Sequence, residues 1–125
     1  MKENKFRGKN TFNYKWVYGY YFYDKFDDKH YILQAQEDEE EPFMYEVIPE
    51  TVGQYTGLKD DNNEEIYEDD IINTWNKNYR VIYDGYMWAL KDFYISCLDI
   101  PYDAFSEFSG KKVGNIHDNP KLLEV

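Results

Sequence analysis

The stretch "IINTWNKNYRVIYDGYMWAL", residues Ile71 to Leu90, decides the fold class. Apolar, aromatic and β-branched side chains gather in two short runs, Ile71–Trp75 and Tyr79–Tyr83, as they do in strands. The dipeptide Asp84-Gly85 follows, which supplies the positive φ angles of a tight hairpin turn, and Tyr86–Leu90 then returns. The stretch therefore predicts an antiparallel meander, and we expect the chain to be mainly β.

Upstream of this meander the sequence predicts more strands. Short aromatic or β-branched runs alternate with charged or proline-containing turns, and they indicate strands at Lys15–Tyr23, His30–Leu33, Phe43–Ile48 and Thr51–Thr56. Glycine weakens a strand interior, so Gly19 inside the first run predicts a bulge or a close backbone approach.

Downstream, we expect one closing strand and small helical additions. "KKVGNI" (Lys111–Ile116) is typical of a strand, and "DNPKLLE" predicts one helical turn that Asn119 caps and Pro120 begins. "IPYDAFSEF" predicts a short helix from Pro101. No repeat or linker divides the sequence, and 125 residues are enough for one core, so a single domain over residues 1–125 is expected.

The acidic residues are concentrated in one central block. Residues 37 to 70 carry fourteen Asp and Glu against one Lys, and the whole chain has a net charge of −11. This block repels nucleic-acid phosphates and anionic membranes, so we expect no direct binding to either, whereas a basic protein surface would be attracted. The candidate interaction residues are Glu37, Asp38, Glu39, Glu40, Glu41, Asp60, Asp61, Glu64 and Glu65.

The segment "KDDNNEE" within this block has two interpretations. Asp and Asn side chains accept backbone hydrogen bonds in tight turns, which makes the segment a turn between strands. The alternative is a calcium loop, but the central glycine and the flanking helices of an EF-hand are missing. Neighbouring carboxylates such as Asp69 and Asp70 point to opposite faces of an extended chain. We therefore predict no metal, no cofactor and no catalytic residue.

Aromatic residues make up 20% of the chain, and 14 of them are Tyr, which can bury a ring and keep its hydroxyl at the water boundary. Trp16, Trp75 and Trp88 are candidates for an aromatic groove or a subunit interface, with core packing as the simpler account. The histidines His30 and His117 lie far apart and near no Ser or Cys motif, so ordinary structural roles are expected.

Cellular location is predicted from what the sequence lacks. No stretch reaches the roughly 20 apolar residues that cross a bilayer, and Met1–Asn10 has no apolar signal-peptide core. Cys97 is the only cysteine, which excludes an internal disulfide, and its apolar neighbours favour a buried thiol over a nucleophile. We expect a cytoplasmic protein.

Three blocks of the sequence resemble the YopX family of small proteins from phages and prophages of Gram-positive bacteria. They are the opening "ENKFRGKN" with the "YGYY" segment that follows, "VIPETVGQYTGLKDDNNEEIYEDDII" (Val47–Ile72) and "VGNIHDNPKLLE" (Val113–Glu124). The family has glycine where this chain has Asn63 and Asp69, two residue types that tolerate positive φ. The resemblance implies an SH3-like, partly open barrel with small helical additions and an oligomer. It implies no catalytic residue.

Together these observations predict a phage- or prophage-encoded, non-enzymatic protein in the cytoplasm of a bacterial host cell. We expect it to self-assemble and to present an acidic, aromatic-rich surface to a host or phage protein with a basic surface. One alternative is a DNA mimic that inhibits a nucleic-acid-binding protein. A metal-dependent hydrolase is the least favoured function.

Overall fold

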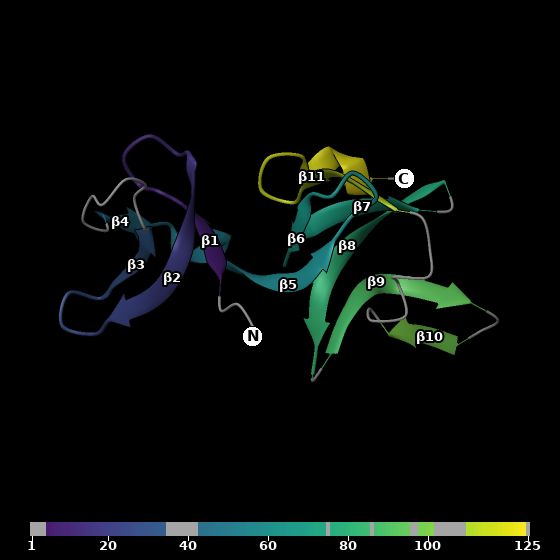
Figure 1. Cartoon of the computed structure of the whole chain (residues 1–125), viewed down its shortest axis with the longest axis horizontal. Helices are drawn as coiled ribbons and strands as arrows, with labels where there is room; N and C mark the ends of the chain where they lie inside the picture. Colours follow the sequence, from purple (N-terminus) through teal and green to yellow (C-terminus); the bar gives the residue numbers. More distant parts are fainter. Residues whose placement is uncertain are drawn as a thin grey trace. The chain divides into compact units, whose positions relative to one another are not determined.

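A computed structural model of the chain describes residues 5–34, 43–74, 76–85, 87–95, 98–101 and 110–124. The chain divides into two compact units, Met1–Tyr55 and Thr56–Val125 (Figure 1). Strands dominate both, so the mainly β class is confirmed. No helix within the described residues is long and apolar enough to cross a membrane. That residues 1–125 form a single domain stays a prediction.

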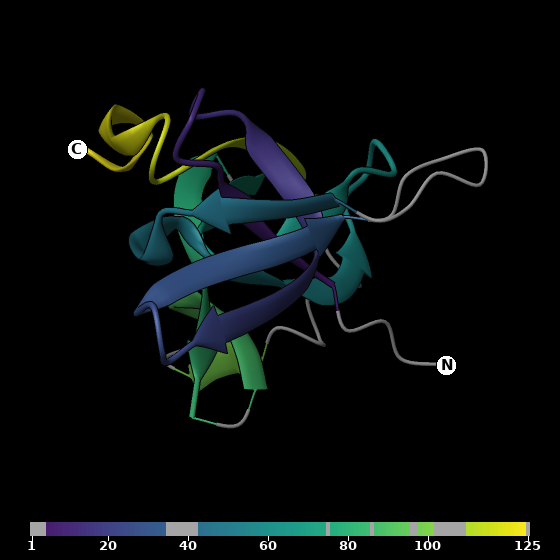
Figure 2. The same ribbon diagram turned by 90° about the vertical axis from the view of Figure 1, so that its left-hand side faces the viewer.

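The first unit holds β4, β3, β2 and β1 of a six-stranded sheet with the strand order β4-β3-β2-β1-β5-β6, and these four strands lie side by side in Figure 2. Strand β5 begins in this unit and ends in the next, and β6 (Glu65–Tyr67) belongs to the second unit. The elements are β1 (Phe6–Lys9), β2 (Trp16–Asp24), β3 (Lys29–Gln34), β4 (Phe43–Val47), the 3₁₀ turn η1 (Pro49–Thr51) and β5 (Gly53–Lys59). The predicted strand Thr51–Thr56 is therefore shifted, because Pro49 first starts a 3₁₀ turn that includes Thr51.

The core of the first unit is made by alternate residues of its strands. Val17, Ile32 and Val47 are buried, and Phe6, Tyr21, Tyr45 and Val52 pack against them. Burying each of these aliphatic side chains contributes roughly 1.5–3 kcal/mol. Gly19 lies in β2, where a Cβ atom would overlap the backbone carbonyl of Leu33 in β3. The close backbone approach predicted at Gly19 is confirmed.

A single bridge links β4, at one edge of this sheet, to the residue that follows β1. Asn10, just after β1, pairs with Val47 at the end of β4. The Thr11 N–H donates to the Glu46 carbonyl, and the Ile48 N–H donates to the Lys9 carbonyl, both at 2.9 Å. One bridge is not a strand ladder, so the described strands form no closed barrel. The SH3-like character that the resemblance implies stays a prediction.

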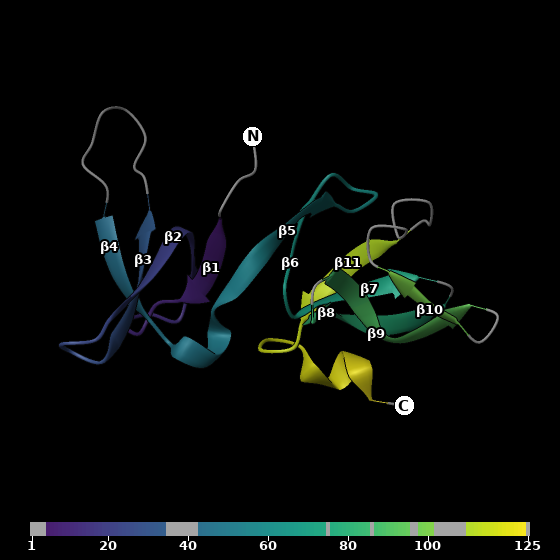
Figure 3. The ribbon, with the colours of Figure 1, turned by 90° about the horizontal axis from the view of Figure 1, so that it is seen from below.

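The second unit contains the predicted meander, in a five-stranded antiparallel sheet with the order β10-β9-β8-β7-β11. The elements of the second unit are β6 (Glu65–Tyr67), β7 (Asp70–Thr74), β8 (Lys77–Asp84), β9 (Met87–Ile95), β10 (Leu98–Pro101), β11 (Lys111–Asn115) and the 3₁₀ turn η3 (Pro120–Leu123). All of these strands except β6 belong to the five-stranded sheet. Figure 3 shows η3 after β11 near the C-terminus. Asp84 pairs with Met87, so the hairpin turn is one residue later than predicted, and Gly85 has a φ of +70°.

The core of this unit lies on one face of the meander. Ile66, Ile72, Val81 and Leu90 are buried together, with Leu58, Tyr79 and Trp88 packed against them.

Two of the downstream predictions need correction. Asn119 precedes η3 as expected but makes no capping bond with its side chain, which instead accepts the Asn115 N–H at 3.3 Å. Pro101 ends β10 rather than starting a helix, and residues 102–109, where the helix would continue, lie outside the described residues. The closing strand is confirmed, one residue shorter than predicted.

Candidate functional site

The acidic turn after β5 is built around the carboxylate of Asp60. Its Oδ1 accepts the backbone N–H groups of Asn62 and Glu64, both at 2.9 Å, and its Oδ2 accepts that of Lys112 at 2.8 Å. Asp60 is only 8% exposed. Its carboxylate thus fastens the turn to β11, which supports the structural interpretation of this segment.

The ionisation of Asp60 follows from these contacts. Burial opposes the charged form and acts to raise the pKa of the carboxyl group. The three backbone N–H donors and the nearby Lys112 ammonium outweigh burial, so the pKa of Asp60 lies below its ordinary value. The carboxylate is therefore charged at neutral pH, and in this form it accepts the hydrogen bonds of the turn.

The other acidic candidates have different surroundings. Asp61 and Glu64 are exposed at the turn, whereas Glu65 is half-buried and accepts the Tyr67 hydroxyl at 3.2 Å. Asn63, beside them, has a φ of +64°, as expected for a residue that replaces glycine. The segment Glu37 to Glu41 lies outside the described residues.

Asp69 and Asp70 do not converge on one point. Asp69 accepts Arg80 Nε at 2.9 Å and Nη2 at 2.8 Å, and its other oxygen lies 3.7 Å from His117 Nε2. Asp70 is fully buried and accepts the Tyr67 N–H at 2.7 Å, with the Lys112 ammonium at 3.5 Å. Each carboxylate therefore serves its own structural contacts. Within the described ranges, acidic, His and Cys side chains form no cluster of three suited to a metal.

The candidate tryptophans are described one by one, and the aromatic groove or interface that they were expected to form stays a prediction. Trp16 lies under two cations, with the Arg7 guanidinium 4.5 Å and the Lys9 ammonium 5.5 Å from its ring centre. Trp88 packs on the core of the second unit and meets Tyr83 edge to face at 5.1 Å. Trp75 and Cys97 lie outside the described residues.

His30 is held by aromatic neighbours. The Tyr21 hydroxyl lies 2.6 Å from His30 Nδ1, and the Tyr23 ring centre is 4.7 Å from the imidazole. The hydroxyl of Tyr23 in turn donates to Asp28 at 2.7 Å, and this hydrogen bond raises the pKa of Tyr23.

An exposed aromatic surface covers one side of β2, β3 and β4. The register places Tyr20 opposite Leu33 and Phe22 opposite Tyr31, while Met44 pairs with Leu33 from the other side. We call this surface the outer face; it consists of Tyr18, Tyr20, Phe22, Tyr31, Leu33 and Met44. These residues alternate with the buried ones, so they project away from the core.

The outer face has the composition of a protein contact surface. Tyr20 is 64% exposed, Phe22 stacks on Tyr31 at 5.3 Å between ring centres, and the Lys29–Glu46 ion pair lies at one end. This surface is not evident from the sequence, because the run "WVYGYYFYD" has aromatic residues at both odd and even positions. The clearest signal lay in β3 and β4, where Ile32 and Val47 are buried. Since side chains alternate along a strand, their direct neighbours in sequence must face outward.

Comparison with known proteins identifies the family. The family model described as YopX protein matches residues 5–124. The crystal structure of protein EF1440 from Enterococcus faecalis is similar, with a TM-score of 0.62 and 18% sequence identity over 99% of this chain and 100% of that chain. This likeness concerns the fold alone. No curated protein matches the sequence. The chain belongs to the YopX family.

Proposed function

We propose that this protein is a non-enzymatic interaction module, encoded by a phage or prophage, that self-assembles through the outer face of its first unit. The observation that carries the proposal is the exposure of Tyr18, Tyr20, Phe22 and Met44 on one side of an antiparallel sheet. Contiguous apolar patches of this kind mark interaction sites in soluble proteins.

A second copy of the chain is the occupant that fits this face best. Tyr, Phe and Met are enriched in the cores of protein interfaces, where a ring buries area at a low cost in conformational entropy. A twofold axis through the face would pair it with itself.

The acidic surface supports a second interaction for the assembled protein. Asp61 and Glu64 are exposed in the second unit, and the segment 37–70 gives the chain most of its negative charge. In a bacterial cytoplasm such a surface attracts a host or phage protein with a basic patch, and the attraction acts mainly on the association rate.

Sedimentation velocity tests the self-assembly directly. The wild-type protein is expected to sediment as a discrete oligomer at about 50 µM, a concentration above the dissociation constants of most specific protein complexes. Tyr20→Glu places a charge at the most exposed position of the outer face, and a twofold contact buries that charge twice. We expect this variant to be monomeric.

Phe26→Glu is the matched control. Phe26 is 90% exposed in the turn between β2 and β3 and is not part of the outer face, so this variant is expected to stay oligomeric. Circular dichroism checks that both variants fold. A monomeric wild-type protein, or equal dissociation of both variants, would refute assembly through the outer face.

A further inference from the structure

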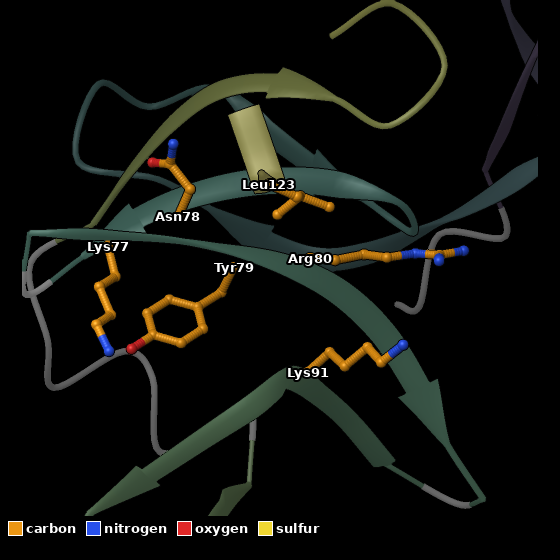
Figure 4. Close-up of a pocket in the computed structure, with 6 residues that line it drawn as sticks. All are labelled: Lys77, Asn78, Tyr79, Arg80, Lys91 and Leu123. Atoms are coloured by element: carbon orange, nitrogen blue, oxygen red, sulfur yellow. The ribbon is translucent and has the colours of Figure 1, made fainter. Parts of the chain in front are cut away.

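A basic pocket in the second unit lies where β8 and β9 part. The ladder between these strands runs from Asp84–Met87 to Val81–Leu90, and beyond it the start of β8 pairs with β7 while the end of β9 pairs with β10. A pocket of about 400 Å³ occupies this fork. It is lined by Lys77, Asn78, Tyr79, Arg80, Lys91 and Leu123 (Figure 4).

Among the described residues, the lining is unusual for so acidic a chain, because it has three cations and no carboxylate. In the described part of the structure, Lys77 and Lys91 form no ion pair with a carboxylate, and both are exposed. The Arg80 guanidinium donates to the Asp69 carboxylate, which holds it in place. Among the described residues, three lining cations less this one carboxylate leave a local charge of +2.

Hydrogen bonds fix one wall of the pocket in advance. The Asn78 amide donates to the Leu122 carbonyl at 2.9 Å and accepts from the Asn73 amide at 2.8 Å. This ties η3 to β8 and places Leu123 at the rim. The Tyr79 ring supplies a second apolar surface, so the pocket has both a charged part and an apolar part.

We infer that this pocket binds a small molecule with a terminal phosphate group. A phosphate monoester carries nearly two negative charges at neutral pH, which matches the local charge of +2. Lys and Arg are the residues that proteins use to hold phosphate oxygens, and a volume of about 400 Å³ suits a ligand of mononucleotide size. The net charge of −11 on the chain disfavours a long polyanion such as a nucleic acid strand.

Isothermal titration calorimetry at low ionic strength tests the inference with three probes: inorganic phosphate, adenosine monophosphate and a 12-residue single-stranded oligonucleotide. We expect phosphate to bind, and the nucleotide to bind more tightly because Tyr79 and Leu123 contact its organic part. Lys91→Gln and Lys77→Gln are each expected to weaken phosphate binding about tenfold, since each removes a hydrogen bond to a charged group. Both lysines are exposed, so the variants should fold.

Lys121→Gln is the control, because Lys121 is an exposed lysine of η3 outside the lining. It should bind phosphate as the wild type does. Lack of binding at about 10 mM phosphate or nucleotide would mean a dissociation constant too weak for a specific site, and it would overturn the inference. Binding of the oligonucleotide alone, or equal weakening by Lys121→Gln, would overturn it too. The outer face takes no part in phosphate binding, so the result of this test is independent of the proposed self-assembly.

Discussion

At the scale of single residues, Asp60 shows how a buried charge can hold a turn together. Taking a carboxylate out of water is costly unless hydrogen bonds replace the lost solvent. Three backbone N–H groups do so here, and one of them comes from Lys112, far along the chain. A local turn and a long-range contact therefore depend on the same side chain.

Asp60→Asn is expected to lower the free energy of unfolding by about 2–3 kcal/mol at pH 7. Asn can keep an oxygen toward Asn62 and Glu64, but its amide group would then face the Lys112 N–H, which places donor against donor. Urea denaturation measures the difference. Asp61→Asn is the control, because Asp61 is exposed, and it should change stability by less than about 0.5 kcal/mol.

The difference in stability between the wild type and Asp60→Asn should depend on pH with a definite sign. The pKa of Asp60 is lower in the folded than in the unfolded chain, so its contribution is complete above the unfolded value of about 3.9. It is lost as the pH falls through the folded pKa. The stability gap between wild type and Asp60→Asn should therefore be constant from pH 5 to 7 and shrink in stronger acid. A gap that grows in acid would contradict this account.

Backbone conformation at single residues was only partly predictable. Asn63 and Asp69 have φ angles of +64° and +71°, as expected where the family has glycine. Tyr14 and Asp28 also have positive φ, and no sequence signal identified Tyr14, because aromatic residues rarely adopt this conformation. The Asn10 side chain imposes the turn around Tyr14 by accepting the N–H groups of Phe12 and Asn13.

At the scale of elements, the pairing of β2 with β3 depends on the missing side chain of Gly19. Gly19→Ala would push a methyl group into the Leu33 carbonyl, a backbone atom that cannot move without breaking the ladder. We expect a loss of about 2–3 kcal/mol in the free energy of unfolding.

Gly85→Asn is the comparison for this prediction. Gly85 has a φ of +70° and open space around it, so Asn should be tolerated within about 1 kcal/mol. Urea denaturation of both variants measures the two effects. If Gly19→Ala proved as mild as Gly85→Asn, the close approach of the two strands would not constrain the sheet.

Elements were predicted better than the places where they meet. Alternation and turn residues located six of the described strands to within two residues, since side-chain period and turn chemistry are local properties. The strands β1, β6 and β10 were not predicted, and β9 extends five residues beyond its predicted end. The outer face and the basic pocket depend on register instead. The fork that gathers Lys77, Arg80 and Lys91 exists because the β8–β9 ladder stops at Val81–Leu90, and tertiary packing rather than local sequence decides where a ladder stops.

At the scale of the whole molecule, net charge and the proposed contacts act in opposite directions. A net charge of −11 on each copy opposes self-association through long-range repulsion, while burial of the outer face favours it. The basic pocket, in contrast, attracts its ligand by charge. The two proposed interactions should therefore respond to salt with opposite signs.

Raising sodium chloride from about 20 to 500 mM shortens the Debye length from roughly 20 Å to 4 Å and screens the repulsion between copies. We expect the dissociation constant of the oligomer, measured by sedimentation equilibrium, to fall several-fold, because the aromatic contact of the outer face is little affected by screening. Phosphate affinity should fall over the same range. An oligomer that salt dissociates would instead be held by ion pairs that involve the acidic block, and Asp61→Asn with Glu64→Gln, rather than Tyr20→Glu, would then weaken it.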